Sequence, residues 1–192
     1  MSIPPETQLA WFTTALEELP AFLPSSDAFR PLHHPPPRMV HDLSLGTMML
    51  TIDSLTAKAD ELTPAESAAW NRAQLRWEAV ASSHAAAIEA KARAEVPHRL
   101  NLWRSFLQDL VEKASETERY ASEVRHRVII ERLLPIAGAD AGEDIVASLR
   151  SSDTHLRAHS VPAAFIWEAV LSAVYPADTF WFLYRLPVTK AG

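Results

Sequence analysis

Residues Thr63–Ser115 form a long stretch without glycine, in which Pro64 and Pro97 are the only prolines. Glycine-free sequence rich in alanine and charged residues favours helix, and a proline at its start fits the first helical turn. Thr63 and Glu66 have the spacing of a capping box, which predicts that a helix begins at Pro64. One unbroken helix would be on the order of 75 Å long, which is too long for a compact domain of this size.

The apolar residues of this stretch fall on two differently oriented faces. The first face holds Trp77, Val80, His84 and Ile88, and the second holds Leu100, Trp103, Phe106, Leu107 and Leu110. At about 100° per residue the second face is rotated by roughly a quarter turn from the first. Pro97 lacks a backbone donor and crowds the preceding turn. We therefore predict a kink or break near Pro97, and we expect His84 to be a hydrogen-bonded core histidine.

Charged residues four apart occur at two places in the first half of the stretch. Glu89 precedes Arg93, and Lys91 precedes Glu95. Such pairs lie on one side of a helix and contribute about 0.3–0.5 kcal/mol each when exposed. Both pairs are predicted to lie on the solvent side.

Apolar spacing and helix caps predict further helices on either side. They are an N-terminal helix ending at Pro20, Val40–Leu62, Pro64–Val96, His98–Ala114, Glu116–Leu134, a shorter helix through Arg150, Val161–Tyr175, and a last short turn over Thr179–Tyr184. Residues 20–38 are rich in proline and are expected to form a linker or surface arm. Ser151–Ser160 is polar and is expected to be a loop, and no strand-like alternation stands out.

These elements predict a single all-α domain over residues 1–192. We expect an antiparallel helical bundle built on a long central helix that is kinked or broken near Pro97, with N- and C-terminal helices packed across it.

The composition excludes several classes of function. The chain has no cysteine, so it has no thiolate metal site, iron–sulfur cluster, disulfide or cysteine nucleophile, and a reducing cytoplasm is expected. A formal charge of −6 argues against binding to nucleic acid or to anionic membranes. Four glycines leave no room for a phosphate-cradling loop motif. No apolar run is long enough to cross a membrane.

Histidine remains as a residue with potential chemistry. His155 and His159 are four apart, so on a helix both rings would face one way and could hold a divalent metal such as Zn or Ni. His41, which falls in the predicted helix Val40–Leu62, could supply a third ligand. This pattern resembles the metal-binding helical bundles of the DinB type, in which an early histidine joins a late H-x-x-x-H pair. The resemblance implies a divalent-metal-binding protein or metal-dependent enzyme using His41, His155 and His159. The alternative is that these histidines are solvent-facing and have no metal.

A second histidine motif is Glu123-Val-Arg-His126, which matches the Glu-x-x-His spacing of di-iron bundles. Those centres need two such motifs, and the chain has no second copy. We therefore expect Glu123 and His126 to lie on an exposed polar face.

Aromatic residues are concentrated in the C-terminal segment Val161–Leu186, whose charged residues are Glu168, Asp178 and Arg185. A segment this apolar is expected to lie in the core or in an interface.

We therefore expect a cytoplasmic, non-catalytic interaction or scaffold protein without a cofactor. It would bind a protein partner or associate with itself, as a homodimer, through the long helix or the C-terminal apolar surface. The rival interpretation is the metal protein above, and a third is an apolar-ligand pocket between helices.

Overall fold

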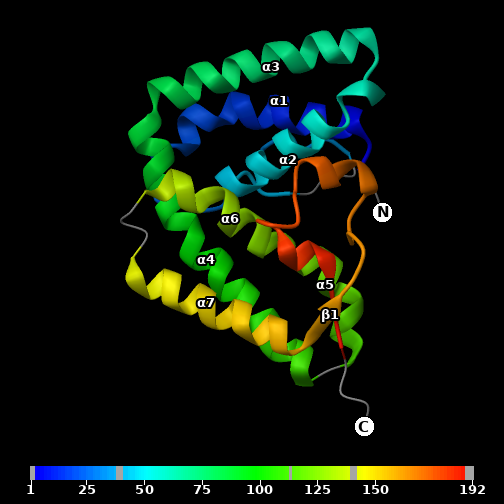
Figure 1. Cartoon of the computed structure of the whole chain (residues 1–192). Helices are drawn as coiled ribbons and strands as arrows, with labels where there is room; N and C mark the ends of the chain where they lie inside the picture. Colours follow the sequence, from blue (N-terminus) through cyan, green and yellow to red (C-terminus); the bar gives the residue numbers. More distant parts are fainter. Residues whose placement is uncertain (1–2, 38–40, 113, 139–141, 189–192) are drawn as a thin grey trace. The chain divides into compact units, whose positions relative to one another are not determined.

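The structure is a computed structural model that describes residues 3–37, 41–112, 114–138 and 142–188. These residues are mostly helical, so the predicted all-α class is confirmed. In chain order the elements are α1 (Pro5–Phe22), α2 (Leu45–Ala57), η1 (Ala59–Glu61), α3 (Pro64–Ser83), α4 (Ala85–Glu112), η2 (Ala114–Arg119), α5 (Tyr120–Glu123), α6 (Arg125–Ala137), α7 (Glu143–Ala158), β1 (Ser160–Pro162), η4 (Ala169–Ala173), η5 (Trp181–Tyr184) and β2 (Arg185–Pro187) (Figure 1).

The chain divides into two compact units. The N-terminal unit is Met1–Glu95 and the C-terminal unit is Val96–Gly192, so the division falls inside α4, just ahead of Pro97. The expectation of one domain over residues 1–192 stays a prediction.

Helix α1 is the centre of the N-terminal unit and contacts both α2 and α3. The apolar stripe that its spacing predicts, Leu9, Phe12, Leu16 and Leu19, is buried. The Phe12 ring meets the Trp70 ring of α3 edge-on, with 5.6 Å between centroids. The helix continues through Pro20 to Phe22, two residues beyond the predicted end. The proline-rich segment that follows is irregular, and a β-bridge between Arg30 and Leu43 holds part of it in place.

Helix α3 begins where the sequence predicts. The Thr63 backbone N–H donates to Glu66 Oε2 at 2.8 Å, and the Glu66 N–H donates to Thr63 Oγ at 3.3 Å, which completes the capping box. Along its 20 residues α3 buries only Trp70 and Ala73, while Leu75 is 67% exposed. Most of the second half of α3 is therefore exposed or only partly covered.

The long stretch breaks at His84 and not at Pro97. His84 has φ −123° and ψ 28°, and its ring and the Ser83 hydroxyl contact carbonyl groups of the last turn of α3. Side chains that bind these carbonyls compete with the backbone donors that would extend a helix. His84 is exposed, so the core-histidine prediction is also wrong. Helix α4 runs through Pro97, because buried side chains at Val96 and Leu100 hold the helix on both sides of the proline.

Two charged residues of α4 face inward, contrary to prediction. Lys91 is 4% exposed, and its Nζ donates to the Ser25 carbonyl at 2.8 Å and to the Asp27 carbonyl at 2.6 Å, beyond the C-terminal end of α1. Glu95 is 1% exposed, and its Oε2 accepts the Gly46 N–H at 2.9 Å in the first turn of α2. Lys91 lies near the C-terminus of α1 and Glu95 lies at the N-terminus of α2, so the helix dipole stabilises each charge. The other predicted pair, Glu89–Arg93, does form on the surface.

The core of the C-terminal unit includes an aromatic cluster. Trp103 and Phe106 of α4 stack with 5.7 Å between ring centroids, and Tyr120 of α5 packs against both. The buried Tyr120 hydroxyl donates to the Phe182 carbonyl at 2.7 Å, which joins α5 to η5. The predicted helix Glu116–Leu134 is replaced by η2, α5 and α6, and α6 continues through Pro135.

The last forty residues differ most from prediction. Residues Ser151–Ser160 were expected to be a loop, but α7 extends to Ala158 because Leu149, Ser152 and Leu156 form a buried helical stripe. No α-helix covers the described segment Val161–Tyr175. This segment contains β1 and η4, and β1 pairs with β2 in an antiparallel ribbon.

Candidate functional site

The structure brings two of the three predicted metal ligands together. His155 lies in the last turn of α7 and His159 caps its end, with their ring centroids 4.4 Å apart. His41 belongs to the N-terminal unit, where it precedes α2 in non-helical backbone, so its predicted place in a helix is wrong. Its carbonyl accepts the Trp11 Nε1–H at 3.0 Å.

Hydrogen bonds define the state of the two adjacent rings. His159 Nδ1 donates to the His155 carbonyl at 2.9 Å, which leaves Nε2 of His159 as the acceptor nitrogen when the ring is neutral. His155 Nε2 is buried and has no hydrogen-bond partner in the described part of the chain. Burial and the neighbouring His159 lower the pKa of His155, although a hydrogen bond to the Leu107 backbone opposes this shift. His155 is therefore neutral at pH 7.

A metal centre usually needs a third protein ligand. Within residues 3–37, 41–112, 114–138 and 142–188, no group of three or more His, Asp or Glu side chains is arranged to hold a metal ion. The hydrogen bond of His159 Nδ1 leaves its Nε2 as the nitrogen that can accept a ligand, whereas Nε2 of His155 is buried.

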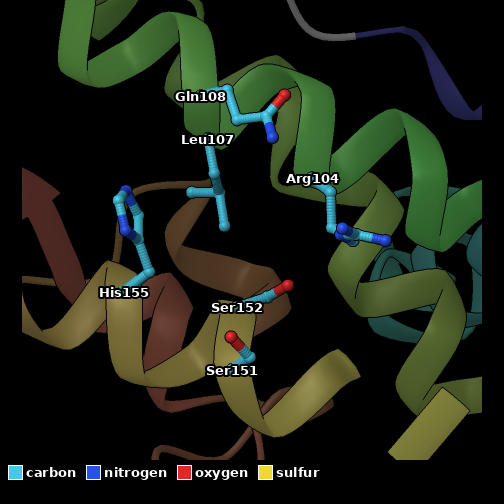
Figure 2. Close-up of a pocket in the computed structure, with 6 residues that line it drawn as sticks. All are labelled: Arg104, Leu107, Gln108, Ser151, Ser152 and His155. Carbon is cyan, nitrogen blue, oxygen red and sulfur yellow. The ribbon is translucent and has the colours of Figure 1, made fainter. Parts of the chain in front are cut away.

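A polar cavity lies between α4 and α7, next to His155. Its volume is about 160 Å³, and it is lined by Arg104, Leu107, Gln108, Ser151, Ser152 and His155. Figure 2 shows Arg104 and Gln108 extending from α4 on one side, with the two serines of α7 opposite. A second hollow shares Ser151 and His155 and is also lined by Ala147, Arg150 and Thr154. We call the two together the α4–α7 cavity.

The lining of the α4–α7 cavity is basic. Arg104 and Arg150 line it, and none of the described lining residues is a carboxylate. Neither guanidinium makes a hydrogen bond or ion pair with any described residue, so both are available to a ligand. Sequence reasoning missed this site. The spacing of Arg104 to Gln108 and of Ser151 to His155 places each pair on one helix face, but nothing in the sequence indicates that the two faces meet.

The β1–β2 ribbon has an unusual distribution of side chains. Val161 pairs with Leu186, and the ladder continues through the Val188 N–H, which donates to the His159 carbonyl at 2.9 Å. Val161, Leu186 and Val188 lie on the same face and are 47%, 48% and 48% exposed. On the opposite face Ser160 and Pro187 are buried. We call the three exposed aliphatic side chains the ribbon face.

The ribbon edges contain prolines. The Val188 N–H donates to the His159 carbonyl and the Ala163 N–H donates to the Tyr184 carbonyl. Hydrogen-bonded pairs alternate with non-hydrogen-bonded pairs along an antiparallel ribbon, so Pro162 and Pro187 lie in non-hydrogen-bonded pairs. The backbone nitrogens of Pro162 and Pro187 therefore point outward and carry no hydrogen, which prevents regular addition of another strand.

His126 is buried and not on an exposed polar face as predicted. It is 4% exposed, and its Nδ1 accepts a hydrogen bond from Arg99 Nη1 at 3.3 Å. Glu123 Oε2 lies 3.5 Å from its Nε2. Burial, with the nearby charges of Arg99 and Arg125, lowers the pKa of His126 to about 3. Both ring nitrogens have protein neighbours, so the residue is structural.

Arg127 is a buried charge of the C-terminal unit with two carboxylate partners. Its Nε and Nη2 donate to the two carboxylate oxygens of Asp153 at 2.9 and 3.0 Å, and its Nη1 donates to Glu131 at 2.7 Å. The guanidinium also lies 4.5 Å from the Phe182 ring centre. This network fixes α7 against α6 and thereby positions the α7 side of the cavity.

Comparison with protein families, with characterised proteins and with solved structures finds no match for this chain. Among the described residues, no helix is both long and apolar enough to span a membrane.

Proposed function

We propose that this chain is a cytoplasmic, non-catalytic interaction protein that forms a homodimer through the ribbon face. The observation that carries the proposal is the reversed alternation of the ribbon, in which aliphatic side chains face outward while Ser160 and Pro187 are buried. Exposed aliphatic groups that are continuous across two strands are typical of an interface.

A second copy of the chain is the partner that best fits this patch. The ribbon face carries no formal charge, and Arg185 lies on the opposite face, where its Nε donates to Ser160 Oγ at 2.7 Å. Two copies can therefore meet about a two-fold axis without like-charge repulsion. Because the prolines block the edges, the contact would be face to face.

The dimer is expected to be weak. Complete burial of an aliphatic side chain contributes about 1.5–3 kcal/mol, and these three are already half buried. Association must also offset lost rigid-body freedom, so we expect a Kd between about 1 μM and 1 mM.

Sedimentation equilibrium across this concentration range tests the proposal. Leu186→Glu should abolish association, whereas the matched control Leu75→Glu, on exposed α3, should not. An equimolar mixture of Leu186→Glu and Leu186→Lys should restore it, because the two copies then carry opposite charges. A wild-type chain that stays monomeric at about 1 mM, or a Leu186→Glu variant that still dimerises, would sink the proposal.

Divalent-metal binding is a second candidate function, favoured by the adjacent rings of His155 and His159. We propose Zn or Ni as the ion, with a water or another group completing its coordination. Untagged protein should bind one ion in titration calorimetry, and His159→Ala should remove binding while His34→Ala, an exposed histidine, leaves it intact. Absence of bound ion under metal-replete conditions would exclude it.

A further inference from the structure

We propose that residues 35–37, which we call the triproline segment, are a docking site for a partner protein whose groove is lined by tryptophan and tyrosine rings. Grooves of this kind recognise a preformed polyproline II helix. The triproline segment belongs to the N-terminal unit, whereas the ribbon face belongs to the C-terminal unit. The proposed site is therefore separate from the ribbon face and does not depend on dimerisation.

The sequence of the triproline segment restricts its backbone to one conformation. Each proline ring holds its own φ at about −65°. A residue that precedes a proline is disfavoured in the α region, and both Pro35 and Pro36 precede one. Every peptide bond in the described part of the chain is trans. These restrictions leave the polyproline II helix, which has three residues per turn, as the conformation of the segment.

The structure leaves two sides of the triproline segment open to solvent. Consecutive residues of a polyproline II helix point about 120° apart. Pro35 and Pro37 are exposed, whereas Pro36 is partly covered. Residues 31–37 contain no aspartate, glutamate, lysine or arginine. The accessible surface therefore consists of apolar rings without formal charge, which suits an aromatic groove better than a charged surface.

The triproline segment also has hydrogen-bond acceptors that the described residues do not use. Proline has no backbone N–H, so a polyproline II helix forms no internal hydrogen bonds. No described residue donates a hydrogen bond to the carbonyl of Pro35 or Pro36. Tryptophan and tyrosine combine an apolar ring with an N–H or O–H donor. An aromatic groove can therefore pack against the proline rings and donate to these carbonyls at the same time.

The residues that precede the triproline segment are anchored on the N-terminal unit. Arg30 and Leu43 exchange backbone hydrogen bonds of 3.0 and 2.7 Å. Leu32 is 6% exposed. The His33 backbone N–H donates to Glu18 Oε1 at 2.9 Å, and His33 Nδ1 lies 2.8 Å from Glu18 Oε2. Because the approach to the segment is already ordered, docking should cost little conformational entropy.

Titration of purified SH3, WW and EVH1 domains with the full chain tests the proposal. These domains bind polyproline II helices in aromatic-lined grooves, so they serve as probes for the chemistry of the partner. At least one should bind with a Kd between about 10 μM and 1 mM, because three prolines offer a small contact area. NMR spectra of the labelled domain should change at the aromatic residues of its groove. If none of the three binds at about 1 mM chain, the proposal is wrong.

Substitutions of exposed prolines provide a matched comparison. Pro35→Ala combined with Pro37→Ala should weaken binding by about tenfold, because two rings and two fixed φ angles are lost. Pro24→Ala, at an exposed proline without a proline neighbour, should leave binding unchanged. Pro37→Ala alone should give a smaller loss and serves if the double variant does not fold. An equal loss in the Pro24 and Pro37 variants would overturn the proposal.

A synthetic peptide of residues 30–37 separates the contribution of the fold from that of the sequence. The folded chain should bind the same domain more tightly than the peptide does, because the fold orders the approach to the triproline segment. If the peptide binds and the folded chain does not, the fold hides the segment and the proposal is wrong. Because Leu186→Glu should bind the domain normally, failure of this site and failure of dimerisation are distinguishable.

Discussion

The buried charges of α4 in the N-terminal unit and Arg127 in the C-terminal unit have different kinds of partners. In the N-terminal unit, Lys91 and Glu95 bind backbone groups near the ends of α1 and α2. In the C-terminal unit, Arg127 binds two carboxylate side chains, Asp153 and Glu131. A charge that caps a helix end can be replaced by a neutral group of similar hydrogen bonding, whereas removal of one member of a buried ion pair leaves its partner uncompensated. Substitutions in the C-terminal unit should therefore cost more.

The largest effect is expected for Arg127→Met, which leaves the Asp153 and Glu131 carboxylates without the guanidinium. Breaking a buried ion pair costs about 3–5 kcal/mol, and we expect about 4 kcal/mol in the free energy of unfolding. Urea denaturation at pH 7 measures this, with the exposed Arg76→Met as control. If Arg127→Met lowers the free energy of unfolding by less than about 1 kcal/mol, the network contributes no more to stability than a surface ion pair does.

The next largest effect is the pH dependence that originates at His126. Its folded pKa of about 3 lies below the unfolded value near 6.5, so between these pH values only the unfolded state takes up the proton. The stability from this residue is present above pH 6.5 and is lost as the pH falls toward 3. Between pH 7 and pH 4 the loss should be about 3 kcal/mol. His126→Gln should reduce the acid sensitivity, and His34→Gln should not; equal acid sensitivity in both variants would contradict the assignment.

A smaller effect is expected for Lys91→Met in the N-terminal unit. The substitution keeps the aliphatic part of the side chain but leaves the Ser25 and Asp27 carbonyls without their donor. Hydrogen bonds to a charged group contribute about 1.5–3 kcal/mol, and we expect a loss of about 2 kcal/mol in urea denaturation. If this loss equals or exceeds that of Arg127→Met, the proposed difference between the units is wrong.

The smallest effect should come from Glu95→Gln. The amide oxygen can still accept the Gly46 N–H, while the negative charge is removed from the α2 N-terminus and from the neighbourhood of Lys91. The interaction of a charge with a helix end is worth up to about 2 kcal/mol when partly buried, and we expect the free energy of unfolding to fall by about 1 kcal/mol. Glu89→Gln, on the surface of the same helix, is the matched control and should change the stability by less than about 0.5 kcal/mol.

Local signals in the sequence predicted the fold where one segment carried all the information. The capping box at Thr63 and the stripe of α1 depend on residues close in sequence, and both predictions are confirmed. A kink or break was predicted near Pro97 because proline was weighed against intrinsic helix propensity alone; α4 does not break there, because packing at Val96 and Leu100 outweighs that penalty. The helix predicted to end at Arg150 continues to Ala158, and this second half was missed because the polar residue Ser152 occupies a buried position of its stripe.

The candidate site was less predictable, because its parts are distant in sequence. The H-x-x-x-H spacing indicated that His155 and His159 would be neighbours if their segment were helical, although a loop was expected there; His155 lies in α7, His159 caps it, and their rings are adjacent. The contribution of Arg104 and Gln108 depends on how α4 and α7 pack, which no local pattern encodes. The ribbon was missed because each strand has three residues, too few for an alternation to be recognised.

The weak burial of the second half of α3 has a consequence for local dynamics. The helix is fixed at its beginning by the Thr63 capping box and by Trp70, but from Leu75 to Ser83 no side chain is fully buried. Opening this half exposes little new apolar surface, so it should require far less free energy than global unfolding. Amide hydrogens should therefore exchange with solvent progressively faster from Trp70 toward His84, and a protease should cleave the native chain first near the α3–α4 junction.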